Sequence, residues 1–291
     1  MTYRGRFAPS PTGSLHFGSL VAAVASYADA LHNQGTWLVR MEDVDESRVV
    51  EGSADEILRM LEALGFEWNE TVIYQSQRKR RYAEVLDQLS RQRLAYVCSC
   101  SRREIAALAK TGIEGPVYPG TCRKANDAFS SGKAVRLRTT EEEICFEDLV
   151  QGKHCQVLSR DIGDFVIHRA DGYTAYQLAV VVDDADQRIS RIVRGADLLL
   201  STPRQIYLQN LLGFPRLAYA HVPLVKDDQG RKLSKQDLAH PVSADRPLES
   251  LLAAWHFLRQ ISPSQQLDRV EDFWLWAADK WDITRISALN Q

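Results

Sequence analysis

The 291-residue sequence has few of the features that mark membrane, secreted or fibrous proteins. No apolar run reaches the roughly 20 residues that a membrane-spanning helix needs, and no signal-peptide-like apolar segment follows Met1. The five cysteines are few and odd in number, which argues against a disulfide framework and for a reducing compartment. Internal repeats and low-complexity stretches are absent as well. We therefore expect a globular, cytoplasmic protein.

A strong net charge is also lacking. The sequence holds 36 Lys and Arg residues against 38 Asp and Glu residues, a net charge of -2 with neutral histidine. An RNA partner would have to be held by local basic patches, because the overall field of the protein does not attract nucleic acid. Hydrophobic residues make up 45% of the chain and charged residues 25%, as in ordinary globular domains. The length allows one large domain or two of ordinary size.

The first twenty residues have the pattern of a strand, a tight loop and a helix. Residues 4–7 lead into a loop rich in proline and glycine, and an apolar, alanine-rich stretch begins at Ser19. In such a unit the loop amides and the helix N-terminus form an anion site, and His16 lies at its mouth. A plain turn before a helix, with His16 on the surface, is the alternative that spacing alone leaves open.

The rest of the chain alternates apolar segments with turn residues, which predicts an α/β fold. We expect strands at 36–41, 134–137, 144–149, 165–168, 189–193 and 218–223, and helices at 53–64, 75–94, 102–110 and 201–212. The apolar segment 174–182 fits either a helix or a strand. Two or three helices are expected near the end, where the cluster of Trp274, Trp276 and Trp281 is more typical of core packing than of a ligand platform.

Charged residues near two of these elements need separate interpretation. Glu42, Asp43 and Asp45 follow the strand at 36–41, at the carboxyl end where α/β folds bind ligands. Glu42 is best placed to face a pocket, whereas solvation or helix capping explains Asp43 and Asp45 equally well. We interpret the basic run at 78–81 as the solvated face of a helix rather than as a phosphate site.

Three cysteines fall within one short window, as Cys98-x-Cys100 and Cys122. Thiolates so close together in a segment with little apolar content suggest a Zn²⁺ site that stabilises a piece too small for a core of its own. Three unrelated buried cysteines are the alternative. Tetrahedral zinc needs a fourth ligand, and the candidates are Tyr118, Cys145, His154 and Cys155.

Two short motifs resemble the signatures of class I aminoacyl-tRNA synthetases. His16-Phe-Gly18 resembles their HIGH motif, and Lys232-Leu-Ser-Lys235 resembles their KMSKS motif. Leu233 and Gln236 depart from the second pattern, but both lysines are retained, so we expect the ATP chemistry to be kept while loop-closure kinetics could differ. Further ordered motifs resemble the glutamyl branch, namely Phe7–Gly13, Arg40–Asp45, Gly163–Val166, Val180–Asp184, Arg194–Asp197 and Ser201–Arg204.

The resemblance covers roughly residues 4–240 and implies a Rossmann-like nucleotide-binding fold. It divides the chain into a first catalytic half at 1–95, an inserted acceptor-type subdomain with the zinc site at 96–190, a second catalytic half at 191–240, and a short helical region at 241–291. Glutamyl-tRNA synthetases carry a large helical anticodon-binding region after the KMSKS loop, for which residues 236–291 are too few. A catalytic domain alone, with a Cys-x-Cys…Tyr…Cys insertion, is similar to the glutamyl-queuosine tRNA(Asp) synthetases.

That resemblance implies an ATP-dependent ligase that activates L-glutamate and transfers it to the queuosine base in the anticodon arm of tRNA(Asp). It implies catalytic roles for His16, Lys232 and Lys235. ATP, with Mg²⁺, would be bound by His16, Gly18, Ser19, Lys232 and Lys235. Glutamate would be bound by Arg6, Ala8, Ser10, Glu42, Tyr176 and Arg194. One structural Zn²⁺ would be held by Cys98, Cys100, Tyr118 and Cys122.

Within this pocket Glu42 would take the substrate ammonium, and Arg6 or Arg194 a carboxylate. Which arginine binds which carboxylate stays open, with Arg194 as the expected specificity residue. We expect a monomer.

Three other functions remain open at this stage. A shortened glutamyl-tRNA synthetase would charge the 3′ end of tRNA(Glu), and an enzyme of the same fold could use an acceptor other than tRNA. A catalytically inactive RNA-binding paralogue is disfavoured because His16, Glu42, Lys232 and Lys235 are all present.

Overall fold

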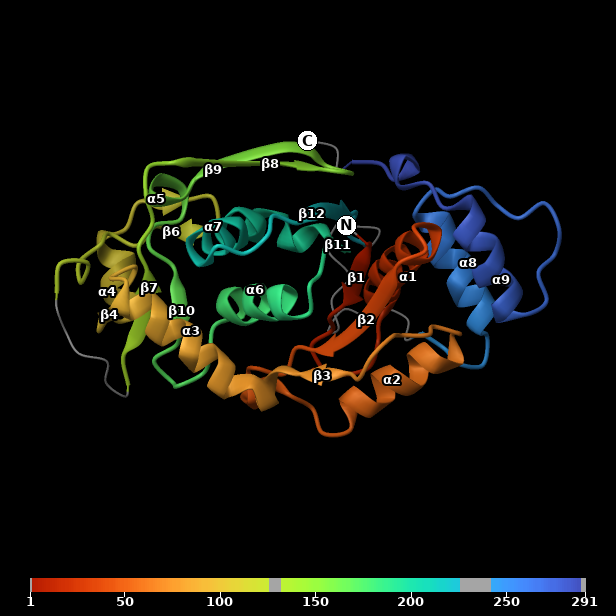
Figure 1. Cartoon of the computed structure of the whole chain (residues 1–291), viewed down its shortest axis with the longest axis horizontal. Coiled ribbons are helices and arrows are strands. Elements are labelled where there is room, and N and C mark those ends of the chain that lie inside the picture. The colour runs from red at the N-terminus through yellow and green to blue at the C-terminus, as the bar shows by residue number, and fades with distance from the viewer. Residues whose placement is uncertain (1, 126–131, 226–241, 289–291) are drawn as a thin grey trace.

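The computed structural model describes residues 2–125, 132–225 and 242–288 (Figure 1). The strands are β1 (Arg4–Phe7), β2 (Thr36–Met41), β3 (Ile73–Tyr74), β4 (Ala95–Cys98), β5 (Thr111–Gly112), β6 (Gly115–Pro116), β7 (Ala134–Leu137), β8 (Glu143–Asp148), β9 (Gly152–Val157), β10 (Val166–His168), β11 (Arg191–Gly195) and β12 (Ala218–Val222). The helices are α1 (Phe17–His32), α2 (Ser53–Ala63), α3 (Lys79–Arg91), α4 (Arg102–Leu108), α5 (Leu158–Asp161), α6 (Tyr176–Asp186), α7 (Thr202–Leu212), α8 (Pro247–Phe257) and α9 (Val270–Lys280).

Parallel strands form the centre of the molecule. β1 pairs with β2 and β2 with β3, while β11 pairs with β12, all in parallel. The N–H of Ser190, directly before β11, donates to the carbonyl oxygen of Arg4 at 2.9 Å, so β11 lies on the free side of β1. The resulting order, β3-β2-β1-β11-β12, is that of a doubly wound nucleotide-binding fold. The Rossmann-like α/β fold implied by the resemblance is thus confirmed.

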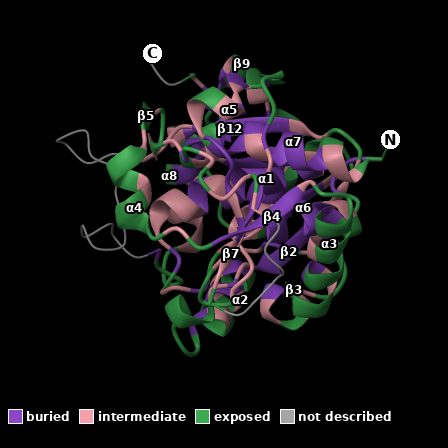
Figure 2. Ribbon diagram, turned by 90° about the vertical axis from the view of Figure 1, so that its left-hand side faces the viewer, coloured by how far each residue is buried: buried purple, intermediate pink, exposed green. Residues whose placement is uncertain are grey.

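Both faces of this sheet are covered, as parallel strands require. Alternate residues of β2 enter different cores: Trp37 and Val39 join a core with α1, α2, α8 and α9, and Leu38 joins one with α3, α6 and α7. β12 alternates in the same way, with Tyr219 and Ala220 in opposite cores. Figure 2 shows buried residues gathered on α1, α6 and β12, and exposed residues on the outer side of α3.

The C-terminal helices complete the first of these cores. The indole N–H of Trp274 donates to the carbonyl oxygen of Leu64 at 2.9 Å, and that of Trp281 donates to Oδ1 of Asp29 at 3.0 Å. Trp255, Trp274 and Trp281 are all buried, and Trp276 packs against them. The prediction that these tryptophans are core residues is confirmed.

The segment between the two halves of the sheet contributes to two places. β4, β7 and β10 form a separate antiparallel sheet that carries α4 and the short β5–β6 pair. The β8–β9 hairpin instead extends the central sheet, because Asp148 of β8 pairs with Tyr219 of β12. Part of the segment between the two halves of the sheet, the β8–β9 hairpin, therefore lies next to the parallel strand β12.

Most predicted elements are confirmed, and the ambiguous segment 174–182 proves to be the helix α6. The sequence analysis missed β9, and with it one covalent link. Cys145 and Cys155 lie opposite each other in the antiparallel register of β8 and β9 and form a disulfide. The expectation of reduced cysteines is therefore wrong for this pair, because an unrecognised hairpin brings both side chains to one face. Among the described helices, none is long and apolar enough to cross a membrane.

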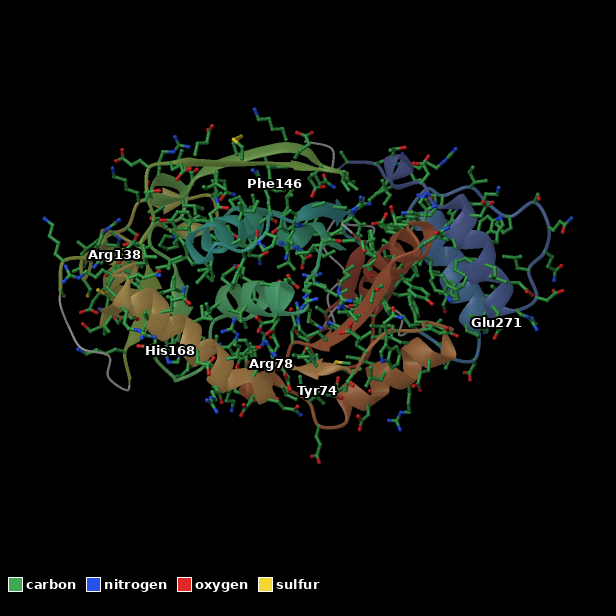
Figure 3. All side chains as sticks on the ribbon, in the orientation of Figure 1. Tyr74, Arg78, Arg138, Phe146, His168 and Glu271 are labelled. Atoms are coloured by element: carbon green, nitrogen blue, oxygen red, sulfur yellow. A yellow bond between two sulfur atoms is a disulfide. The ribbon has the colours of Figure 1, made fainter. Side chains whose placement is uncertain are left out.

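The basic run before and within α3 is paired with acidic side chains. Arg78 (Figure 3) binds Oδ1 of Asp183 through Nε at 2.7 Å, and Arg81 binds both carboxylate oxygens of Asp186. Lys79 and Arg80 pair with Glu46 and Glu84. The interpretation of this run as a helix face rather than a phosphate site agrees with these ion pairs.

Replacing Trp281 by Phe should destabilise the protein by about 2 kcal/mol, because the buried carboxylate of Asp29 loses a hydrogen bond from the indole N–H. The free energy of unfolding from urea titration measures this effect. Trp276→Phe is the matched control, since Trp276 is only partly buried. Equal losses for the two variants would contradict the assigned role of the Trp281–Asp29 bond.

Candidate active site

A cavity of about 400 Å³ opens at the carboxyl ends of β1, β2, β11 and β12. Open α/β sheets bind ligands at this edge, where connections from adjacent strands leave in opposite directions. Its polar walls are Arg6 from β1, Glu42 after β2, Tyr176 at the start of α6, and Arg194 from β11. Residues of the loop at 8–16 line another part of the cavity.

That loop is fixed by backbone and side-chain hydrogen bonds. The hydroxyl of Ser53, at the start of α2, donates to the carbonyl oxygen of Gly13 at 2.8 Å and accepts the N–H of Gly13 at 3.0 Å. The N–H of Glu42 donates to the carbonyl oxygen of Pro9 at 2.9 Å. Gly13 has a φ of 134°, which only glycine adopts readily. The loop is therefore held over the end of β2.

His16 caps α1 while it lines the cavity. Its Nδ1 accepts the N–H of Ser19 at 3.2 Å, and its Nε2 lies 3.0 Å from the Ser19 hydroxyl. In the neutral ring this assigns the proton to Nε2. The ring lies over Gly18, where a Cβ would approach imidazole atoms at 3.3 Å. A glycine at position 18 thus lets His16 stay between the helix start and the cavity.

A buried ion network supports the acidic wall. Arg6 binds both oxygens of Asp184, through Nε at 3.1 Å and Nη2 at 3.4 Å. Nη2 of the fully buried Arg40 binds Oδ1 of Asp184 at 2.9 Å and Oε1 of Glu42 at 3.3 Å, while its Nη1 binds Gln187 at 2.7 Å. Burial raises the pKa of Glu42 against the opposing pull of Arg40 and Arg6. The carboxylate of Glu42 is thus anchored at the cavity wall.

Asp184 is the shared anion of this network. Burial acts to raise its pKa, but Arg6 and Arg40 outweigh burial and hold the pKa below its ordinary value. Arg6 therefore already has a carboxylate partner within the protein, although it lines the cavity.

Arg194 differs from Arg6 because its partners are neutral. Its Nε donates to Nε2 of His221 at 3.0 Å, and its Nη2 donates to Oγ1 of Thr202 at 2.9 Å and to Oε1 of Gln205 at 2.7 Å. Its Nη1 is buried and has no hydrogen-bond partner among the described residues. An anion that enters the cavity could pair with the Arg194 guanidinium without breaking an existing ion pair.

The structure brings most of the predicted site residues to one cavity. Arg6, Ala8, Ser10, His16, Gly18, Ser19, Glu42, Tyr176 and Arg194 all line it. Lys232 and Lys235, together with Leu233 and Gln236, lie outside the described residues. Arg48, in the 3-10 turn at Glu46–Arg48, also lines the cavity and was missed, since a single arginine after an acidic run gives no distinctive signal.

The two other carboxylates after β2 have structural partners. Asp43 accepts the backbone N–H of Ser76 at 2.8 Å and its hydroxyl at 2.6 Å. Asp45 binds Nη1 of Arg169 at 2.6 Å and the hydroxyl of Ser47 at 2.7 Å. These contacts favour the structural interpretation of Asp43 and Asp45.

A second cluster lies beside β4. The sulfur atoms of Cys98, Cys100 and Cys122 lie within 4.8 Å of one another, and the cluster could hold a metal ion. The Tyr118 hydroxyl oxygen lies 3.3 Å from Sγ of Cys98 and 3.7 Å from Sγ of Cys100. Burial acts to raise the pKa of the Cys122 thiol, but hydrogen bonds, first from the Ser99 backbone, lower it to about 7. Three soft sulfur donors and one oxygen donor suit zinc.

The other candidates for a fourth ligand are placed elsewhere. Cys145 and Cys155 are joined in the disulfide of the β8–β9 hairpin. Nε2 of His154, on β9, lies 3.2 Å from the carbonyl oxygen of Gln151. Of the four residues that spacing left open, Tyr118 alone contacts the cysteine cluster among the described residues.

Replacing Asp184 by Asn should lower the free energy of unfolding by about 3 kcal/mol, because Arg6 and Arg40 would lose their shared buried anion. Denaturant titration measures the change. Asp186→Asn is the matched control on the same helix, since Asp186 pairs with Arg78 and Arg81 near the surface and should contribute less than about 1 kcal/mol. Comparable losses would show that burial of the network does not determine its contribution to the free energy of unfolding.

Comparisons with known proteins show the family of this chain. The family model of the catalytic domain of class I tRNA synthetases (E and Q) matches residues 2–261. A glutamyl-Q tRNA(Asp) synthetase of Dechloromonas aromatica is 56% identical over 288 residues, covering 98% of this chain and 95% of that protein. One of Chromobacterium violaceum is 50% identical over 286 residues, with 98% and 96% covered.

Solved structures show the same fold. A glutamate tRNA ligase from Elizabethkingia meningosepticum superposes with a TM-score of 0.77 at 22% identity, covering 100% of this chain and 66% of that one. The chain thus spans slightly less than two thirds of that ligase. A methionyl-tRNA synthetase of Mycobacterium tuberculosis gives a TM-score of 0.56 at 12% identity, with 86% and 64% covered. Since both family model and relatives match nearly the whole sequence, the chain belongs to the glutamyl-Q tRNA(Asp) synthetases, within the class I tRNA synthetases for glutamate and glutamine.

Proposed function

We propose that the protein activates L-glutamate with ATP and transfers the glutamyl group to the queuosine base in the anticodon arm of tRNA(Asp). The observation that carries the proposal is the cavity at the sheet edge, which is lined by both Glu42 and Arg194, an arginine whose buried Nη1 has no hydrogen-bond partner among the described residues. This cavity offers both a cationic and an anionic wall to an amino acid that carries both charges. The proposal includes a monomeric enzyme in the cytoplasm.

Glutamate would bind with its side-chain carboxylate on Arg194 and its ammonium on Glu42. Arg194 is assigned this carboxylate because its hydrogen-bond partners are neutral, whereas Arg6 is already paired with Asp184. Burial and the nearby Glu42 raise the pKa of Tyr176 to about 12, so its phenol stays protonated and can donate a hydrogen bond. Arg6, Ala8 and Ser10 complete the pocket from the loop side.

ATP would lie against the start of α1. Its phosphates would contact the helix N-terminus together with His16 and Ser19. Gly18 would leave room for the ribose and adenine. Lys232 and Lys235 would bind the phosphate oxygens from the KMSKS-like loop. Mg²⁺, carried by ATP, would supply charge neutralisation on the phosphates.

The reaction would proceed in two displacements. An oxygen of the glutamate α-carboxylate attacks the α-phosphorus of ATP, and the bond to pyrophosphate breaks. His16 and the two lysines would stabilise the charge that develops on the phosphate oxygens. A hydroxyl of the queuosine base then attacks the acyl carbon, and AMP leaves as the acyl–phosphate bond breaks.

We further propose that one structural zinc ion is held by Cys98, Cys100, Tyr118 and Cys122. These donors converge at one point, and Nε of Arg136 donates to Sγ of Cys98 at 3.3 Å. The guanidinium of Arg136 also lies 3.8 Å from the centre of the Tyr118 ring, so it contacts two of the proposed ligands. The zinc ion would fix the segment at 96–125. This segment belongs to the proposed acceptor-type subdomain at 96–190, which lies in the sequence between proposed catalytic halves at 1–95 and 191–240. The proposed helical region at 241–291 follows.

The function is tested by transfer of labelled glutamate, with ATP and Mg²⁺, to three RNAs in parallel. These are tRNA(Asp) with queuosine, tRNA(Asp) with unmodified guanosine at that position, and tRNA(Glu). We expect label on the queuosine-containing tRNA(Asp) alone. Label on tRNA(Glu) would overturn the proposed acceptor and indicate a shortened glutamyl-tRNA synthetase.

The glutamate pocket is tested with Arg194→Lys, measured by glutamate-dependent pyrophosphate exchange. Loss of the planar guanidinium should raise the KM for glutamate about a hundredfold, while the KM for ATP stays within about twofold. Arg191→Lys is the matched control, because Arg191 lies on the same strand with its side chain toward Asp29. An unchanged glutamate KM in Arg194→Lys would remove Arg194 from the pocket.

The zinc ligands are tested by metal content. The wild-type protein should contain about one zinc ion per chain, and Cys122→Ser should lose it. Tyr118→Phe keeps the ring but removes the ligand oxygen, so it should bind zinc more weakly in competition with a chromophoric chelator. Equal zinc affinity in Tyr118→Phe and wild type would show that the phenol oxygen is not a ligand.

A further inference from the structure

Behind Arg194 lies a buried chain of two groups that do not line the cavity. His221 of β12 accepts the Nε–H of Arg194 on its Nε2 at 3.0 Å. Its Nδ1 lies 2.6 Å from Oδ2 of Asp148, the last residue of β8. Both side chains are 0% exposed. Neither residue can touch a substrate in the cavity, so any effect on the substrate passes through Arg194.

The hydrogen bonds define one tautomer of His221. Asp148 accepts at Oδ2, so Nδ1 carries the ring proton and Nε2 presents its lone pair to Arg194. Burial lowers the pKa of His221 to about 4, so the ring is neutral near pH 7. Oγ1 of Thr202 also lies 3.2 Å from Nε2.

The carboxylate of Asp148 is itself held in one orientation. Its Oδ1 accepts the backbone N–H groups of Gln151 at 2.9 Å, Val150 at 3.0 Å and His221 at 3.1 Å. These donors come from the turn between β8 and β9 and from β12. Only Oδ2 is left to face the imidazole, so the orientation of His221 follows from the backbone of the hairpin.

This arrangement orients Arg194 without neutralising it. A carboxylate in direct contact would compensate the guanidinium charge, as Asp184 does for Arg6. The imidazole separates Asp148 from Arg194 and offers a neutral acceptor instead. The guanidinium is thus fixed at Nε and Nη2, and its Nη1 keeps a strong preference for an anionic partner.

We propose that His221 and Asp148 are positioning residues that fix Arg194 for the side-chain carboxylate of the substrate and thereby determine the preference for glutamate over glutamine. The inference rests on the proposed glutamate pocket and adds two residues behind it. Glutamine, with a neutral side-chain amide, would gain less from the same guanidinium.

The first test is Asp148→Asn, which preserves shape but changes the tautomer. The three backbone N–H groups require an oxygen at Oδ1, so the amide nitrogen takes the place of Oδ2 and donates to Nδ1 of His221. The ring proton then moves to Nε2, where it opposes the Nε–H of Arg194. We expect the KM for glutamate to rise about tenfold, with kcat and the KM for ATP within about twofold. The ratio of kcat/KM for glutamate over glutamine should fall.

A pair of substitutions at His221 separates positioning from packing. In His221→Gln the amide nitrogen and oxygen are joined through one carbon, as the two ring nitrogens are, so the side chain can donate to Asp148 and accept from Arg194. We expect His221→Gln to keep the glutamate KM within about threefold and His221→Leu to raise it about tenfold. Equal KM values in the two variants would overturn the proposal.

A packing control comes from the same strand as Asp148. Phe146 (Figure 3) lies on the side of β8 that faces α7, and the centroid of its ring lies 6.5 Å from that of the His221 ring. Phe146→Leu should lower the melting temperature and leave the glutamate KM unchanged. A glutamate KM that rises with falling melting temperature in all variants, Phe146→Leu included, would reduce His221 and Asp148 to a structural role.

Arg194→Lys distinguishes failure of the proposed glutamate pocket from failure of the positioning inference alone. If it leaves the glutamate KM unchanged, the proposed pocket itself is wrong. If it raises that KM while Asp148→Asn and His221→Leu do not, the pocket stands and the positioning inference alone is overturned.

Discussion

The structure depends on two buried ion pairs that link two strand ends to one aspartate on a helix far along the chain. Asp184 of α6 binds Arg6 at the end of β1 and Arg40 near the end of β2. All three side chains are almost completely buried, so removing one partner would leave a buried charge without compensation, at a large cost in stability. The carboxyl ends of β1 and β2 are therefore held at a fixed distance from α6, and Glu42 is fixed through Arg40.

Two arginines in one cavity serve different purposes because their partners carry different charges. Arg6 faces a carboxylate and is part of the frame, whereas Arg194 is surrounded by the neutral acceptors His221, Thr202 and Gln205. Coulomb interactions are strong in a buried site, so a cation without an anionic partner attracts an anionic ligand more than a paired one does. The sequence alone does not reveal these partners, since each arginine lies near the end of a short strand that holds a second arginine.

How far the sequence predicts the structure depends on the range of the contacts involved. β2 was predicted with its observed bounds because an apolar run between Gly35 and Glu42 is a local signal. The cavity residues were predicted because their motifs are contiguous and resemble a known family. β9 was missed because its residues do not alternate clearly, and the disulfide between Cys145 and Cys155 depends on that hairpin.

The residues that support the site could not be predicted from the sequence, because they too depend on contacts between distant parts of the chain. Asp184 and Arg6 are separated by 178 positions, and His221 and Asp148 by 73, so no local pattern relates them. A buried aspartate in an apolar helix predicts a polar partner but does not name it.

The position of the β8–β9 hairpin gives the intervening segment a direct part in the catalytic sheet. β8 follows the small antiparallel sheet in the chain, yet it pairs with β12, and its last residue reaches the imidazole behind Arg194. Three N–H groups fix that carboxylate, two from the hairpin turn and one from β12, so a shift of the hairpin would move the acceptor that orients the guanidinium. The proposed boundary between the insertion and the second catalytic half is therefore a division of the sequence only, because residues on both sides of it position Arg194.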